Sequence, residues 1–140
     1  MTAPPGDPRA DIPHRPPILC IDRVVAAGGD RAAAEGDVGD GPLVVGGELW
    51  EGGLLEGMTQ TAAVLLNGDL EASGRRARRG VLAGIRGLAI ARRPRVGERV
   101  RFTASVIRVL FPLSLVSCEA RSGDEVLASG EMKFYTEVEP

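Results

Sequence analysis

One segment limits the folds open to this chain more than any other: the nearly all-apolar helix predicted over residues 54–66. Apolar side chains recur there at helical spacing, and the pair Asn67-Gly68 supplies a stop signal. Small residues lie within it, and polar positions are few. A helix that is apolar nearly all round has to be covered on most of its surface. The apolar positions are Leu54, Leu55, Met58, Ala62, Leu65 and Leu66.

The flanking segments can supply that cover, because they have the pattern of β-strands. Turn signals separate the strands, and residues 39–47 have the composition of a loop. Two strands, a helix and four strands predict an α+β fold in which an antiparallel sheet wraps one long helix. The open edges of such a sheet predict at least a dimer. The strands are predicted at residues 18–25, 31–38, 81–91, 98–109, 113–120 and 125–135.

Length and composition indicate the broad class. The 140 residues fit a single domain, in which we expect residues 1–11 to be a flexible N-terminus. No apolar run approaches the roughly 18 to 20 residues of a membrane span, and no secretion signal is present, so we expect a soluble, cytoplasmic protein. Cys20 and Cys118 lack the spacing of a metal motif and are expected to be free thiols. A net charge of −2 argues against nucleic acid, and no pattern indicates a metal or cofactor.

Glu56 stands out because it is a carboxylate within the apolar helix. Burying a charged group without a partner costs several kcal/mol. This carboxylate should therefore either reach water or serve chemistry. A tunnel that needs it explains its presence better than packing does, so we expect Glu56 to face a narrow cavity at a subunit interface.

Three blocks, in order, resemble one known family. Residues 12–24, IPHRPPILCIDRV, resemble the pattern L-P-H-R-Y-P-F-L-L-V-D-R-V, and residues 54–65 are similar to a helix containing E-A-M-A-Q. Residues 81–100 are similar to L-A-G-I-x-x-A-R-F-R-R-P-V-x-P-G-D. These blocks are typical of the 3-hydroxyacyl-acyl-carrier-protein dehydratases of fatty acid synthesis. The resemblance covers most of residues 12–135 and implies the hotdog fold, a long helix wrapped by an antiparallel sheet, in a dimer or a trimer of dimers.

The resemblance also implies a reaction, the loss of water from a 3-hydroxyacyl thioester. Relatives use a histidine on the loop before the helix, a helix glutamate from the neighbouring subunit, and a glycine N–H that polarises the thioester carbonyl. By resemblance, Glu56 is the catalytic glutamate and Gln60 is the glutamine one turn later. The glycine N–H maps onto Gly52 or Gly53. Trp50 is expected to pack in the wall of the substrate pocket.

The histidine loop is where the sequence departs from the family. Relatives carry G-H-F-P-G-x-P-I-M-P-G, and an ungapped alignment from Glu56 sets Pro42 at the histidine position. His14 is the only histidine in the chain, and we expect it to be structural. The candidates for a substitute acid or base are His14, Glu48 and Glu51. The loop also resembles, more distantly, dehydratase-like subunits of aryl polyene and other polyketide pathways that read W-V-G-I-E-Y-M-A-Q.

Two arginine-rich segments, RRARR at residues 75–79 and ARRPR at residues 91–95, have two interpretations. One is a solvated loop. The other is a landing surface for an acidic partner, which the resemblance would make an acyl carrier protein. The candidate contacts are Arg76, Arg79, Arg92 and Arg93.

Three functions remain open on the sequence alone. The first is a dehydratase with a changed base that acts on acyl-carrier-protein thioesters. The second is a non-catalytic subunit or acyl-binding module, which would form a heterodimer with an active homologue instead of a homodimer. The third is a hotdog thioesterase in which Glu56 activates water. The family blocks favour the first two.

Overall fold

The central element is helix α1, Glu51–Ala72, in a computed structural model that describes residues 6–72, 74 and 77–138. Leu54, Met58 and Ala62 are fully buried along it. A Cβ placed on Gly57 would lie 2.2 Å from the Phe102 ring, so only glycine lets the helix backbone approach the sheet this closely. The apolar sequence of this helix therefore fits a position inside the fold.

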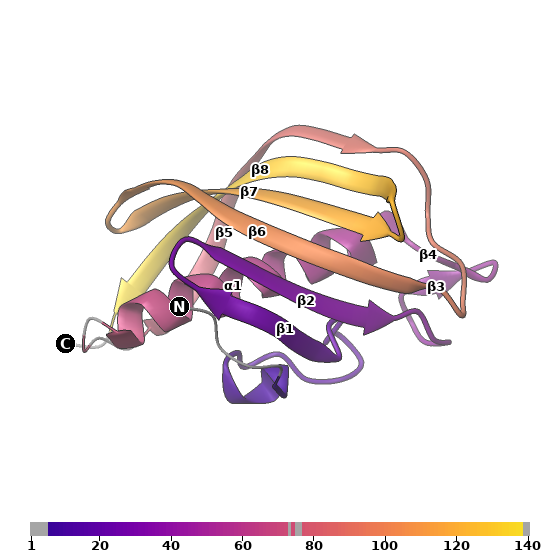
Figure 1. Cartoon of the computed structure of the whole chain (residues 1–140), viewed down its shortest axis with the longest axis horizontal. Helices are drawn as coiled ribbons and strands as arrows, with labels where there is room; N and C mark the ends of the chain where they lie inside the picture. Colours follow the sequence, from indigo (N-terminus) through magenta and orange to yellow (C-terminus); the bar gives the residue numbers. More distant parts are fainter. Residues whose placement is uncertain (1–5, 73, 75–76, 139–140) are drawn as a thin grey trace.

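A curved antiparallel sheet of six strands covers α1, with strand order β1-β2-β6-β7-β8-β5. Figure 1 shows the helix running along one face of the sheet, and α1 contacts β1, β2, β5, β6 and β7. The predicted α+β class and the hotdog arrangement are confirmed. The sheet strands are β1 Arg23–Gly28, β2 Arg31–Asp37, β5 Ala77–Ile90, β6 Arg99–Leu110, β7 Leu113–Ser122 and β8 Glu125–Val138.

The core lies between the sheet and α1. Alternate residues of the central strands point inward, as the period of two in a strand requires. Val100, Phe102 and Ala104 do so on β6 and are each 1% exposed. Ala34 on β2 pairs with Phe102, so the buried face continues across the sheet.

The two edges of the sheet differ. Gly6 pairs with Val24 and so covers part of the outer edge of β1. At the opposite edge, β5 pairs only with β8 among the described strands. An unpaired edge that is also apolar favours pairing with another chain. The large apolar side chains exposed on β5 are Val81, Leu82, Ile85 and Leu88.

The first strand begins later than the sequence predicts. We expected a strand from residue 18, whereas β1 begins at Arg23. The amide of Gln60 accounts for the difference, because it accepts a hydrogen bond from Cys20 N and donates one to Ile18 O. These backbone groups are thus paired with a helix side chain.

The predicted helix stop at Asn67-Gly68 is wrong, since α1 continues to Ala72. Asn67 does not end the helix, because its side-chain amide donates instead to the Asp11 carbonyl at 3.0 Å. The helix also begins earlier than expected, at Glu51.

Three further segments differ from expectation. The predicted loop at 39–47 contains β3, Val44–Val45, which pairs with β4, Glu48–Leu49, through a turn whose Gly46 and Gly47 have positive φ. The arginine-rich loop at 75–79 is partly strand, because β5 begins at Ala77. Of the N-terminus expected to be flexible, the 3-10 helix η1, Pro8–Ala10, and the bridge at Gly6 are ordered structure.

Candidate functional site

Glu56 and Gln60 form a hydrogen-bonded pair on one face of α1. Glu56 is half-buried, whereas Gln60 is fully buried. The Gln60 amide nitrogen donates to Glu56 Oε2 at 3.1 Å and to Ile18 O at 2.9 Å, and its oxygen accepts from Cys20 N at 2.7 Å. Both amide protons are therefore used within the chain. In this arrangement Gln60 orients the carboxylate of Glu56 and fixes the segment that precedes β1.

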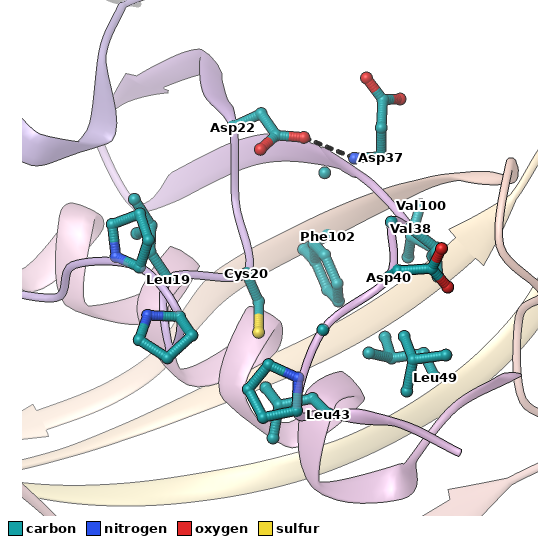
Figure 2. Close-up of a pocket in the computed structure, with 17 residues that line it drawn as sticks. Leu19, Cys20, Asp22, Asp37, Val38, Asp40, Leu43, Leu49, Val100 and Phe102 are labelled. Carbon is teal, nitrogen blue, oxygen red and sulfur yellow. Dashed lines mark hydrogen bonds between the residues drawn. The ribbon is translucent and has the colours of Figure 1, made fainter. Parts of the chain in front are cut away.

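A cleft of about 390 Å³ opens beside this segment. It lies between the residues that precede β1, the loop that follows β2, and the first residues of β6 (Figure 2). Its volume falls within the range of about 300–1,000 Å³ typical of ligand pockets. The apolar lining comprises Leu19, Val38, Leu43, Val44, Leu49, Val100 and Phe102, together with Pro16, Pro17 and Pro42.

Cys20 lines the cleft, and its sulfur points into it in Figure 2. Burial raises the pKa of this thiol to about 12, with a further contribution from the negative charges of Glu56 and Asp22. The thiol is thus protonated near neutral pH and is a poor nucleophile there. The Gln60 amide bonds both Cys20 N and Glu56 Oε2, so the carboxylate lies near Cys20, although Glu56 is not among the residues that line the cleft.

No imidazole occupies the position that the family histidine would take. Pro42 lies there, exposed on the loop that lines the cleft. His14 is half-buried in the segment before β1, and its Nδ1 is enclosed without a hydrogen-bond partner in the described part of the chain. Glu56 has no hydrogen bond to His14 among the described contacts; the one described at its carboxylate comes from Gln60.

The residues at the start of α1 lie together. The Trp50 ring is half exposed and rests on Gly52, since a Cβ there would lie 2.3 Å from the ring. Gly53 N donates to Trp50 O at 2.8 Å, so that N–H is already engaged. Trp50 does not line the cleft described above.

The two loop carboxylates proposed as substitute bases lie near arginines. Glu51 accepts a hydrogen bond of 2.7 Å from Arg93, which lowers the pKa of this carboxyl. Glu48 lies in a shallow pocket with Arg92, Arg93 and Arg95. The bond from Arg93 thus makes the Glu51 carboxylate a weaker base than a free one.

The predicted carrier-protein contacts fall into two groups. Arg92 donates to both carboxylate oxygens of Glu98, at 2.9 and 2.8 Å, and also bonds Glu125. With Arg93 bound to Glu51, these two arginines are paired within the chain. Arg76 and the side chain of Arg79 lie outside the described residues.

The comparisons with known proteins identify the family. Residues 7–139 match the ApeP-like family, described as ApeP dehydratase. The chain belongs to the ApeP-like dehydratase family. It is also 28% identical over 134 residues, 88% of each chain, to the 3-hydroxyacyl-[acyl-carrier-protein] dehydratase FabZ of Bacillus pumilus (strain SAFR-032). The resemblance seen in the three sequence blocks is thereby confirmed.

Solved structures support the same fold. The dehydratase heterocomplex ApeI:P from Xenorhabdus doucetiae matches with a TM-score of 0.85 and 17% identity, over 94% of this chain and 91% of that one. An uncharacterised protein from Pyrococcus horikoshii, PH1136, matches with a TM-score of 0.68 and 16% identity, over 85% of this chain and 84% of that one. At these identities the likeness concerns the fold.

Two further observations bear on the chemistry. Among the described residues, no group of three or more histidine, cysteine, aspartate or glutamate side chains is placed to hold a metal ion. No described helix is long and apolar enough to cross a membrane. The cleft and the bond between Gln60 and Cys20 N could not be expected from the sequence, because the residues that form them are distant along the chain.

Proposed function

We propose that this chain is a cytoplasmic dehydratase subunit that acts on 3-hydroxyacyl thioesters together with a homologous, histidine-bearing chain. In the reaction, a base takes the C2 proton, the C3–O bond breaks, a proton reaches the leaving hydroxyl, and a C2=C3 double bond and water result. We assign protonation of the hydroxyl to Glu56, and removal of the C2 proton to the imidazole of the partner. The carboxylate of Glu56, oriented by Gln60, is the observation that carries this proposal.

Two features support pairing with a second chain, and the first of them favours a chain of another sequence. Pro42 has no proton to exchange, and His14 has no described contact with Glu56. The edge of β5 is unpaired in the described structure and exposes apolar side chains, so a second chain could extend the sheet there. The solved ApeI:P assembly is a heterocomplex of dehydratases, which is a precedent for such pairing.

The substrate class rests on a relative. FabZ is a dehydratase of 3-hydroxyacyl-acyl-carrier-protein, so we propose a carrier-bound thioester for this chain as well. We further propose that Arg76 and Arg79, in the arginine-rich segment 75–79, help to attract the acidic carrier. Arg92 and Arg93 are weaker candidates, because both are paired with carboxylates. Such attraction weakens with salt, so carrier binding that is equal at low and high salt would contradict this role.

The test compares three samples: the chain alone, a histidine-bearing homologue alone, and the two mixed. Each receives a 3-hydroxyacyl carrier-protein thioester, and the conjugated enoyl product is followed by its ultraviolet absorbance. We expect the mixture to exceed the sum of the separate samples, and Glu56→Gln in this chain to remove the gain. Full activity of the chain alone would instead indicate a substitute base such as His14, Glu48 or Glu51. Hydrolysis of a plain acyl thioester would indicate a thioesterase. A gain on mixing that Glu56→Gln leaves unchanged would indicate a non-catalytic subunit.

A further inference from the structure

We propose that the turn between β6 and β7 is a membrane-docking tip, which inserts apolar side chains into a lipid surface that carries anionic headgroups. The turn consists of Phe111 and Pro112, between the last residue of β6, Leu110, and the first residue of β7, Leu113. Figure 1 shows it at the end of the molecule where α1 ends, whereas β3 and β4 lie at the opposite end. The inference goes beyond the proposed reaction and does not depend on it.

The tip exposes apolar side chains on both faces of the hairpin. Ser114 is buried, so the adjacent Leu113 points to the outer face of the sheet, as the alternation of a strand requires. Leu110 lies opposite Leu113 and shares that face, whereas Val109 lies opposite Ser114 on the inner face. Val109, Leu110, Phe111 and Leu113 are all exposed. A flat protein surface covers one face of such a hairpin, whereas a lipid surface surrounds an inserted tip on both.

The apolar surface continues across the outer face of the sheet. Tyr135 on β8 lies opposite Leu113 and is exposed, so Leu110, Leu113 and Tyr135 form a row over three neighbouring strands. Neighbouring strands are about 4.8 Å apart, so the row spans roughly 10 Å. A contiguous exposed apolar surface marks a site of interaction with a protein or a membrane. Tyrosine is enriched where lipid meets water, because its ring is apolar and its hydroxyl is polar.

Two cations lie directly behind this row. Arg108 on β6 and Lys133 on β8 both lie opposite Leu115 of β7, two residues along their strands from Leu110 and Tyr135. That separation is about 7 Å. Both cations are exposed, and neither has a hydrogen bond or ion pair with another described residue. Apolar side chains that dip about 5–10 Å into a bilayer would bring cations at this distance to the lipid phosphates.

The arginine-rich segment 75–79 enters the sheet beside the tip. It leads into Gly80 of β5, which pairs with Thr136 of β8, and Thr136 N donates to Pro112 O in the turn at 2.9 Å. A basic segment beside an apolar tip favours anionic lipid, because electrostatic attraction adds to the free energy of apolar insertion. The acidic residues of this part of β8 each lie opposite an arginine of β5, Glu131 opposite Arg86 and Glu137 opposite Arg79.

Vesicle sedimentation tests the proposal without substrate, carrier or partner chain. The full chain is mixed with vesicles of phosphatidylcholine alone, or of phosphatidylcholine and phosphatidylglycerol in equal parts, and the sedimented fraction is measured. We expect the chain to bind the mixed vesicles, and this binding to weaken as salt is raised, because salt screens the attraction between cations and headgroups. Binding to phosphatidylcholine alone should be much weaker. A chain that binds neither kind of vesicle would overturn the proposal.

Matched variants locate the docking surface. The double variant Leu110→Gln with Leu113→Gln should lower the partition coefficient by about tenfold or more, because it removes apolar area that the lipid would bury. Arg108→Gln should lower it about fivefold, the share of one cation near an anionic surface. Val45→Gln is the control and should leave binding unchanged. Val45 is 61% exposed and Leu110 62%, but Val45 lies in β3, at the opposite end of the molecule (Figure 1).

Tryptophan fluorescence separates insertion from adsorption by charge alone. Trp50→Phe removes the only tryptophan of the chain. In that background, Leu110→Trp should shift its emission to shorter wavelength on addition of the mixed vesicles, whereas Val45→Trp should not. Equal emission of the two variants, or vesicle binding that the double glutamine variant leaves unchanged, would overturn the docking tip.

Other occupants of the tip would give different results. If the tip joined copies of this chain, the double glutamine variant would have a lower mass than wild type by light scattering. If it bound an acidic protein helix, a helical peptide of leucine and glutamate would shift the emission of Leu110→Trp, and vesicles would not. Either result in place of vesicle insertion would overturn the lipid proposal. Vesicle insertion by a chain that never supports dehydration would uphold it and count against the proposed reaction alone.

Discussion

At the scale of single residues, the carboxylate of Glu56 and the amide of Gln60 form one unit. Gln60 is fully buried and makes three hydrogen bonds, which leaves no amide proton for a substrate. Its role is therefore to hold Glu56 and the chain before β1 in one arrangement. Replacing Glu56 should lower the reaction rate, whereas replacing Gln60 should lower stability, because only Glu56 has a proton-transfer role in the proposed reaction.

Glu56→Gln should remove catalysis while preserving the fold. Glutamine keeps the shape of the side chain and its ability to accept from Gln60, but it cannot transfer a proton. We expect the rate of the mixed dehydratase to fall by roughly 100- to 10,000-fold, with the melting temperature unchanged or slightly raised. Glu71→Gln, on an exposed turn of the same helix, is the matched control and should retain the rate. Equal rates for wild type and Glu56→Gln would make the carboxylate dispensable.

Gln60→Met should instead lower stability. The substitution keeps the length of the side chain but leaves Cys20 N without its partner, and Ile18 O with only the Cys20 thiol at 3.3 Å. Since an unsatisfied buried group costs about 1–3 kcal/mol, we expect a loss of that size in the free energy of unfolding by urea. Thr61→Val is the control, because the buried Thr61 hydroxyl bonds only Gly57 O within α1, and its loss should cost less than about 1 kcal/mol. Similar losses of unfolding free energy for both variants would show that the Gln60 bonds stabilise the fold no more than a bond within the helix does.

Residue by residue, the sequence could single out candidates but not their contacts. Glu56 stands out as a candidate because a charge on an apolar helix is anomalous on its own. The partners of Gln60 could not be found, because Cys20 and Ile18 are 40 and 42 residues away in sequence. Hydrogen bonds over such separations depend on the whole fold, which no local pattern encodes.

At the scale of elements, the carboxylate of Glu98 holds separate segments of the chain together by hydrogen bonds. Its carboxylate accepts from Arg92, from Ser122 Oγ at 2.9 Å, and from Arg95 N at 2.5 Å. These bonds link the segment between β5 and β6 to the end of β7. The hydrogen bonds from Arg92, followed by the one from Arg95 N, lower the pKa of Glu98 from 4.5 to about 2.

The pH dependence of stability follows from that shift. A carboxyl with a lowered pKa in the folded state stabilises the protein fully above pH 4.5, and this contribution disappears as the pH falls toward about 2. We therefore expect the free energy of unfolding to decline across that interval. Glu98→Gln should be less stable than wild type near neutral pH and should show a shallower decline. Urea unfolding at a series of pH values checks both, and parallel curves would show that Glu98 does not contribute to the slope.

The elements themselves were predicted with uneven success. The four strands after the helix have clear alternation and turn signals, and their order along the chain is confirmed. Errors arose where a long-range contact overrides a local signal, as when Asn67 bonds Asp11 O instead of capping the helix. The short hairpin of β3 and β4 was missed because its strands have two residues each.

At the scale of the whole molecule, the open edge of β5 is the feature that demands a partner. The β1 edge is partly covered by Gly6, whereas β5 is paired on one side only among the described strands and exposes Val81, Leu82, Ile85 and Leu88. A second chain that adds a strand there would satisfy those groups and extend the sheet. We accordingly expect at least a dimer, of identical or homologous chains, that assembles through β5.

Ile85→Lys should disrupt that assembly without unfolding the chain. Ile85 is 38% exposed on β5, so a lysine there can reach water in a free chain but would be buried by a strand added at the edge. We expect light scattering to give the mass of a dimer or larger for wild type and a lower mass for the variant, with similar circular dichroism. Ile107→Lys is the matched control, because Ile107 is 49% exposed on β6, away from the β5 edge, and should leave the mass unchanged. A wild-type chain that stays folded as a dilute monomer, even with a histidine-bearing homologue present, would show that β5 is not the interface.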